Sequence, residues 1–175
     1  MNRLQTGPQG LAGAPPAPSI FLNTGDFHFA AAPLQLATLL GSCVTVTLWQ
    51  PRRQIGGMCH FMVPSRLGQA GMALDGHFAD EAFALFDRAM LESGCRPEQF
   101  QAKLFGGGDM YPESNLRVTV GAQNIAVART LLRQRGIPVL AEHAGGAGHR
   151  KLIFDLASGE VRMRFANKRR ENRDG

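Results

Sequence analysis

One cysteine and one histidine, Cys43 and His60, are spaced so that a single β-hairpin would bring them together. Residues 43–49 alternate and are rich in β-branched side chains, residues 50–53 are polar, and residues 54–63 are apolar again. This pattern is typical of a strand, a turn and a return strand. If residues 50–53 form the turn, Cys43 faces His60 with the Cβ atoms roughly 4.5–5.5 Å apart. A slip of one residue would place the two on opposite faces.

These residue types are those of a cysteine hydrolase. An imidazole beside a thiol can accept its proton and lower its pKa, and the resulting thiolate is a strong nucleophile. Gly41 allows the backbone to bend, so the N–H groups of Ser42 and Cys43 are candidates to hold an oxyanion. The alternative is a small buried cysteine and a structural histidine. The predicted pairing is what favours the reactive interpretation.

A third residue would orient the imidazole. Thr38 is the main candidate, because its hydroxyl can accept the second ring N–H; Thr45 and Thr47 are weaker ones, because β-branched residues simply suit strands. Cys59 is expected on the other face of its strand, in the core. A zinc site at Cys59 and His60 lacks suitable spacing and companion ligands, so we expect no metal, and acyl transfer requires no organic cofactor.

The composition predicts one globular domain. The chain has 175 residues, of which 44% are hydrophobic, enough for a sizeable core. No apolar run approaches the ~20 residues of a membrane helix, and the first residues lack the apolar region of a signal peptide. The 3 cysteines form no CxxC pair. We therefore expect reduced thiols in the cytoplasm and no membrane insertion.

Both ends of the chain differ in composition from the middle. Residues 1–19 are rich in proline and glycine and are expected to be a flexible leader. Residues 162–174 hold most of the net charge of +5, and residues 167–175 are expected to be a basic, solvated tail. Residues 20–166 then form the folded domain. A nucleic-acid role for the tail and the glycine-rich loop at 145–148 is disfavoured, because aromatic stacking motifs are absent.

Helical and strand patterns are mixed along this domain, and no internal repeat appears, so we expect a single α+β domain. The glycines at 106–108 lack the lysine of a P-loop and are expected to make a tight turn lining a cleft. Helices are predicted over 75–92 and 123–135, and strands within 19–28 and over 101–105, 137–142, 151–156 and 160–165.

Several motifs together resemble the chemoreceptor glutamine deamidase family CheD. The most specific is Gly41-Ser42-Cys43 with His60 at its proper distance. The resemblance spans about residues 22–165. Further matching segments are residues 39–44, 56–64, 78–80, 102–107, 136–139, 145–146, 150–151, 154 and 158–161, together with Gly121 and Asn124.

The resemblance implies an α+β fold of packed mixed β-sheets with outer helices, similar to that of Cys-His toxin deamidases. It implies a cytoplasmic hydrolase that converts chemoreceptor glutamines to glutamates, and some members also cleave methyl esters. Cys43 would be the nucleophile and His60 the general base and acid. Thr38 would be the third residue, although some members carry the threonine where this chain has Ala37. The residues expected at the cleft or the substrate are Gly41, Phe105, Gly106, Gly107 and Asn124.

The resemblance also implies partners. These are the cytoplasmic domains of chemoreceptors and, as in some members, a CheC-type phosphatase; nucleic acid is not expected. The alternative function is a catalytically silent adaptor that binds receptors or such a phosphatase, and the intact Cys43 and His60 pair speaks against it. Gln123, His143 and His149 depart from the family pattern, which bears on specificity more than on chemistry.

Overall fold

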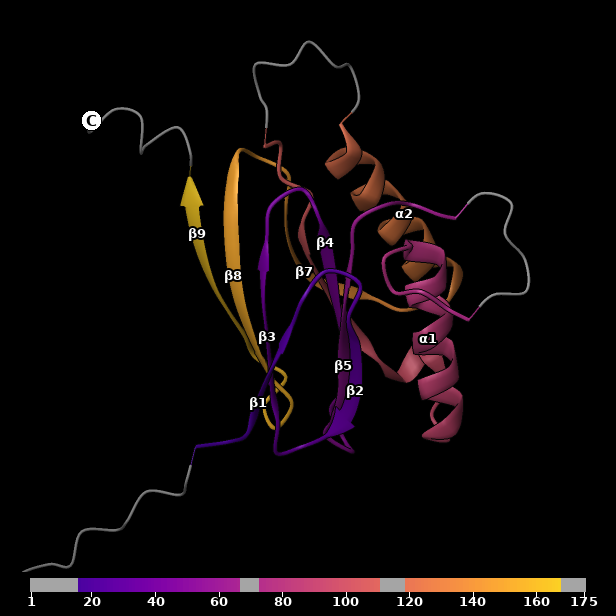
Figure 1. Ribbon diagram of the computed structural model, residues 1–175. Helices are drawn as coiled ribbons and strands as arrows, with labels where there is room; N and C mark the ends of the chain where they lie inside the picture. The colour runs from indigo at the N-terminus through magenta and orange to yellow at the C-terminus, as the bar shows by residue number, and fades with distance from the viewer. Residues whose placement is uncertain (1–15, 67–72, 111–118, 168–175) are drawn as a thin grey trace, which may run out of the picture.

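Two β-sheets pack face to face in the computed structural model, which describes residues 16–66, 73–110 and 119–167 (Figure 1). One sheet has four strands in the order β1-β3-β8-β9, and the other has five in the order β2-β5-β4-β6-β7. The strands are β1 Ser19–Leu22, β2 Phe27–Ala31, β3 Gln35–Leu40, β4 Val44–Gln50, β5 Ile55–Phe61, β6 Gln101–Gly106, β7 Val139–Ala144, β8 Gly148–Asp155 and β9 Val161–Asn167. The helices are α1 Ala79–Glu92, the 3₁₀ turn η1 Pro97–Gln99 and α2 Val120–Gln134.

The two α-helices lie together against the five-stranded sheet, and the four-stranded sheet lies on its other side (Figure 1). Both sheets are mixed, because β1 runs parallel to β3 and β6 runs parallel to β7, while the remaining pairs are antiparallel. The predicted class, α+β with packed mixed sheets and outer helices, is confirmed.

The helix boundaries differ slightly from the prediction. Helix α1 begins at Ala79 rather than residue 75, because Gly76 is taken by a β-bridge to Gly25. Helix α2 begins at Val120, three residues earlier than predicted, because the Thr119 hydroxyl caps it by accepting from the Ala122 N–H at 3.2 Å.

Strand alternation divides the interior into two parts. Val44, Val46 and Cys59 face the helices and belong to the larger core. Met58 faces the other way and packs between the two sheets with Leu36 and Phe154. The expectation that Cys59 is a core residue on the face opposite His60 is therefore confirmed.

The predicted register of the β4–β5 hairpin is wrong. The turn covers residues 51–54, one residue later than expected, because Gln50 continues the strand and pairs with Ile55. Its side chain then holds the turn by accepting from the Arg53 N–H at 2.7 Å. Thr45, not Cys43, lies opposite His60.

Two expectations fall mainly outside the described residues. The leader is described only from residue 16, and β1 already begins at Ser19; the basic tail is described only at residue 167.

None of the described helices is long and apolar enough to span a membrane. Within the same residues, no group of three or more His, Cys, Asp or Glu side chains could hold a metal ion.

Candidate active site

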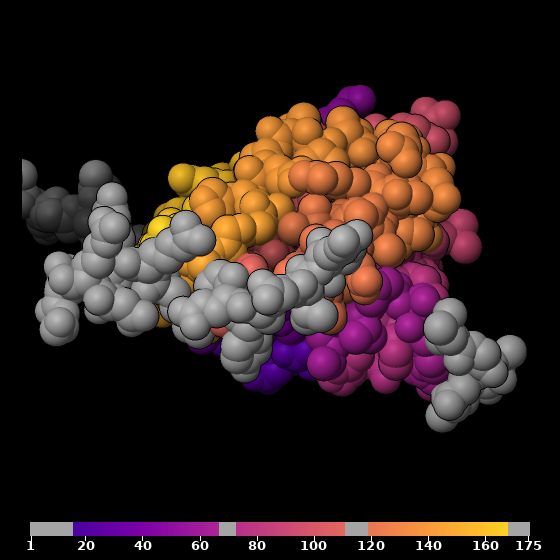
Figure 2. Space-filling model, turned by 90° about the horizontal axis from the view of Figure 1, so that it is seen from above, coloured from indigo at the N-terminus to yellow at the C-terminus, as the bar shows by residue number. Residues whose placement is uncertain are grey.

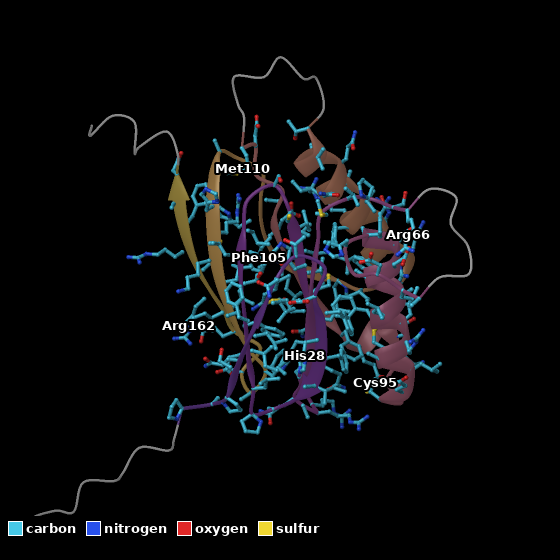
Figure 3. All side chains as sticks on the ribbon, viewed as in Figure 1. His28, Arg66, Cys95, Phe105, Met110 and Arg162 are labelled. Atoms are coloured by element: carbon cyan, nitrogen blue, oxygen red, sulfur yellow. The ribbon has the colours of Figure 1, made fainter. Side chains whose placement is uncertain are left out.

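Cys43 lies where the chain crosses from one sheet to the other. Strand β3 ends at Leu40 in the four-stranded sheet, and β4 begins at Val44 in the five-stranded sheet, so residues 41–43 form the link between the layers. The Cys43 side chain is half-buried and packs against Leu40, Phe105 and Leu152. Phe105 lies between the layers (Figure 3). Figure 2 views the molecule from above, with α2 and the strands that follow it in orange to yellow and the earlier part of the chain, in indigo to magenta, beside them.

His60 meets Thr38 across the gap between the sheets. The His60 Nδ1 atom lies 2.9 Å from Thr38 Oγ1, and Thr38 in turn donates to the Leu22 carbonyl oxygen at 2.8 Å. A carbonyl can only accept, so the single hydroxyl proton of Thr38 points to Leu22, and the Thr38 oxygen accepts the Nδ1–H. This assigns the tautomer: Nε2 carries the free lone pair and can act as a base.

A second threonine at the site is Thr24, which was not among the residues expected from the sequence. Its Oγ1 lies 3.4 Å from His60 Nε2, and hydrogen bonding by its side chain lowers the pKa of the Cys43 thiol, against the larger effect of burial. Thr24 therefore lies between the two residues of the predicted pair. The sequence signals only a turn at residues 23–26, through Asn, Gly and Asp; nothing local indicates that this turn meets a strand 36 residues away.

The glycine turn at residues 106–108, after β6, holds the link at residues 41–43 through backbone hydrogen bonds. Gly107 N–H donates to the Cys43 carbonyl at 2.7 Å, and Gly108 N–H donates to the Gly41 carbonyl at 2.9 Å. Gly106 has φ of 110°, and a Cβ there would lie 2.2 Å from the Cys43 carbonyl oxygen. Gly106 and Gly107 thus hold the Cys43 backbone by close contact. In the described part of the chain, neither the Ser42 nor the Cys43 N–H donates to a backbone carbonyl.

Burial keeps the cysteine and the histidine neutral. Burial raises the pKa of the Cys43 thiol, opposed by hydrogen bonds that the Thr24 side chain and the Cys43 N–H offer to its ionised form. It lowers the pKa of His60, opposed by the Leu22 carbonyl and by Asp26. The expectation that His60 lowers the pKa of Cys43 is therefore wrong for the resting protein. Cys59 is fully buried, and its thiol pKa rises to about 12.

Asn124 lies on α2, beyond the end of β5. Its Nδ2 donates to the Met62 carbonyl at 2.8 Å, so it ties the helix to the segment that follows His60. Its Oδ1 is buried and makes no hydrogen bond within the described residues. The structure brings together five of the predicted features: Thr38, Cys43, His60, Phe105 and the glycine turn. Asn124 lies on α2 and contacts the segment that follows His60.

Comparison with known proteins gives the family. Residues 62–165 match the family model described as CheD chemotactic sensory transduction. The chain is 47% identical over 147 residues to a probable chemoreceptor glutamine deamidase CheD 3 of Dechloromonas aromatica, covering 83% of this chain and 86% of that protein. It is 44% identical over 149 residues to a probable chemoreceptor glutamine deamidase CheD of Pseudomonas syringae pv. syringae, covering 83% of each.

The chain belongs to the CheD family. The segment that matches the family model begins just after His60, so Thr24, Thr38 and Cys43 all lie before it.

Proposed function

We propose that this protein is a chemoreceptor glutamine deamidase that hydrolyses the side-chain amide of receptor glutamines to glutamate and ammonia. The observation that carries the proposal is the row of contacts between the sheets, in which His60 bonds Thr38 through one nitrogen and faces Thr24 with the other, while the Thr24 side chain also acts on the Cys43 thiol. Relatives that are 44–47% identical bear the name of this activity.

The first half of the reaction forms a thioester. His60 Nε2 receives the thiol proton, and the Cys43 thiolate attacks the carboxamide carbon of the glutamine. The N–H groups of Ser42 and Cys43 stabilise the oxyanion that develops. His60 then gives its proton to the departing nitrogen, the C–N bond breaks and ammonia leaves.

The second half releases the product. Water attacks the thioester carbonyl while His60 Nε2 takes one of its protons, and the C–S bond breaks. The proton returns to the sulfur, which restores the neutral pair and leaves a glutamate on the receptor. The same thioester would form from a glutamate methyl ester with methanol as the leaving group, so methyl-esterase activity is a second reaction of this site.

Thr38 acts through His60 in both halves. Because its oxygen accepts the Nδ1–H, it keeps the lone pair on Nε2 and then stabilises the imidazolium. We place the reaction in the cytoplasm, with the cytoplasmic domains of chemoreceptors as substrates and a CheC-type phosphatase as a second partner.

The proposal is tested by mass spectrometry of receptor cytoplasmic fragments incubated with the protein. Each converted glutamine adds roughly one mass unit and releases one ammonia, as amide hydrolysis requires. Cys43→Ala should abolish the conversion. Cys95→Ala, at the opposite end of the molecule (Figure 3), should leave it unchanged. Receptor binding by the wild-type protein without any conversion would instead favour the adaptor function.

A further inference from the structure

We infer that the hydroxyl of Thr24 is the proton bridge between Cys43 Sγ and His60 Nε2. The inference rests on the proposed function and adds a third group that touches the reacting atoms. Thr24 Oγ1 lies 3.4 Å from Nε2, and hydrogen bonding by the same side chain favours the ionised form of Cys43, so it lowers the pKa of the thiol. A distance of this kind is long for a hydrogen bond, and catalytic hydrogen bonds often tighten only once substrate is bound.

The fold holds Thr24 in place through the backbone of His60 itself. The Gly25 N–H donates to the His60 carbonyl at 2.7 Å, and the His60 N–H donates to the Asp26 carbonyl at 3.1 Å. The turn is closed by the Asp26 side chain, which accepts from the Asn23 N–H at 2.7 Å. The position of the Thr24 hydroxyl is therefore coupled to the position of the imidazole that it serves.

Gly25 shows how tightly this turn is packed. Its φ is 88°, and a Cβ at this position would lie 2.2 Å from the ring of His77. Glycine adopts this φ without strain, and any other side chain here would have to displace the His77 ring. Thr24 is thus part of a built site and not of a loop that lies against it by chance.

The direction of proton movement follows from the tautomer of His60. Nε2 carries the lone pair, so the Thr24 O–H donates to Nε2 while the Thr24 oxygen accepts the thiol S–H. On reaction the S–H bond breaks as a new O–H bond forms on Thr24, and the old O–H bond breaks as the N–H bond forms. Sulfur keeps the electron pair, the imidazole becomes cationic, and Thr24 ends neutral.

After the proton transfer, the Thr24 hydroxyl stabilises the Cys43 thiolate. Its proton, which came from the thiol, now points back at the thiolate. A thiolate in a half-buried position has lost much of its contact with water, and a hydrogen bond to its charged form offsets part of that loss. Thr24 therefore serves both to pass the proton and to hold the nucleophile in its reactive form.

The test measures how fast iodoacetamide alkylates Cys43 as a function of pH, without any receptor present. Thr24→Val removes the hydroxyl at nearly constant shape, and we expect alkylation near pH 7.5 to slow about tenfold as the profile moves about one unit toward higher pH. Thr24→Ser keeps the hydroxyl and should stay close to the wild-type profile. Thr24→Ala repeats the test if the valine variant does not fold.

Thr45→Val is the matched control. Thr45 is buried directly opposite His60, and its hydroxyl makes no hydrogen bond within the described residues. The same chemical change there should leave the alkylation profile unmoved. With receptor present, Thr24→Val should lower kcat and leave KM near the wild-type value, because Thr24 touches the reacting groups and not the bulk of the substrate.

The outcomes separate the bridge from the proposed function. A wild-type alkylation profile in Thr24→Val would overturn the bridge, even if Cys43→Ala abolishes deamidation. A profile that moves equally in Thr45→Val would also overturn it, because the shift would then reflect packing. If the wild-type protein deamidates no receptor but the Thr24→Val profile still moves alone, the bridge stands and the proposed substrate fails.

Discussion

His60 has a threonine hydroxyl on each side, and the two hydroxyls differ in what they bond. Thr38 sends its proton to a carbonyl and therefore accepts from Nδ1, whereas Thr24 lies between Nε2 and the thiol. Burial opposes charge on Cys43 and on His60 alike. The resting pair is therefore a neutral thiol and a neutral imidazole, and the ion pair forms only as the reaction begins.

The neutral pair predicts the pH dependence of deamidation. Burial lowers the pKa of His60 below about 6.5, so the imidazole stays a free base to lower pH than an exposed histidine would. The rate should hold from neutral pH downward and fall only as the pH drops through that lowered value. Measuring kcat/KM from pH 5 to 9 checks this. An acid limb above about pH 7 would contradict the neutral pair.

Thr38→Val should lower kcat about ten- to hundredfold. It leaves the buried Nδ1–H without an acceptor, which costs about 1–3 kcal/mol, and it lets the ring turn. Thr38→Ser should restore most of the activity, and a steady-state split of kcat from KM shows whether the effect lies in the chemical step. Thr47→Val, a buried threonine on β4, is the control and should stay near wild type. Equal loss in both variants would mean that packing alone is being measured.

At the scale of the elements, the site depends on one short link and the turn behind it. Residues 41–43 carry the chain between the sheets, and the turn at 106–108 fixes their carbonyls. The strands on both sides of this link could be predicted from alternation. The register could not, because residues 50–54 are all compatible with a turn and only the pairing of Gln50 with Ile55 decides where it begins.

Gly106→Ala should disrupt the site more than an equivalent change elsewhere. Gly106 and Gly94 both have positive φ, 110° and 69°, so alanine is strained at both positions. Only at Gly106 would the new Cβ meet the Cys43 carbonyl oxygen, at 2.2 Å, while at Gly94 nothing lies within 4 Å. We expect slower alkylation of Cys43 in Gly106→Ala alone. Equal alkylation rates would show that the turn does not position the link.

At the scale of the whole molecule, the α+β class could be predicted, since helical and strand periodicities are local properties of the chain. The order of the strands could not, because β1 with β3 and β6 with β7 pair in parallel through connections that carry no pairing signal. Thr24 was missed for the same reason, since its partners are 19 and 36 residues away along the chain. Packing between layers, which local pattern does not encode, brings these groups together.

The packing of the two layers also encloses a cation. Arg150 on β8 is 1% exposed, and its Nε donates to His143 Nδ1 at 2.8 Å. Its guanidinium stacks 4.7 Å from the Phe165 ring centre, and its Nη1 has no partner in the described part of the chain. Burial lowers the pKa of Arg150, as expected for a charge that has lost water without gaining a carboxylate. The guanidinium also donates to the Gly145 carbonyl, but a buried charge that is matched only by neutral partners still costs stability.

His143→Asp should therefore stabilise the fold. A carboxylate at this position would accept from Arg150 in place of the imidazole, and hydrogen bonds to charged groups contribute about 1.5–3 kcal/mol. Thermal unfolding should show this as a rise in Tm of about 2–4 °C for each kcal/mol gained in a chain of this size. His149→Asp, on the exposed side of the same strand as Arg150, supplies the same charge without reaching the buried guanidinium and should leave Tm nearly unchanged. A drop in Tm for His143→Asp would show that the Phe165 ring and the His143 nitrogen already compensate the cation better than a carboxylate does, because the cost of burying the new charge would then exceed its attraction to Arg150.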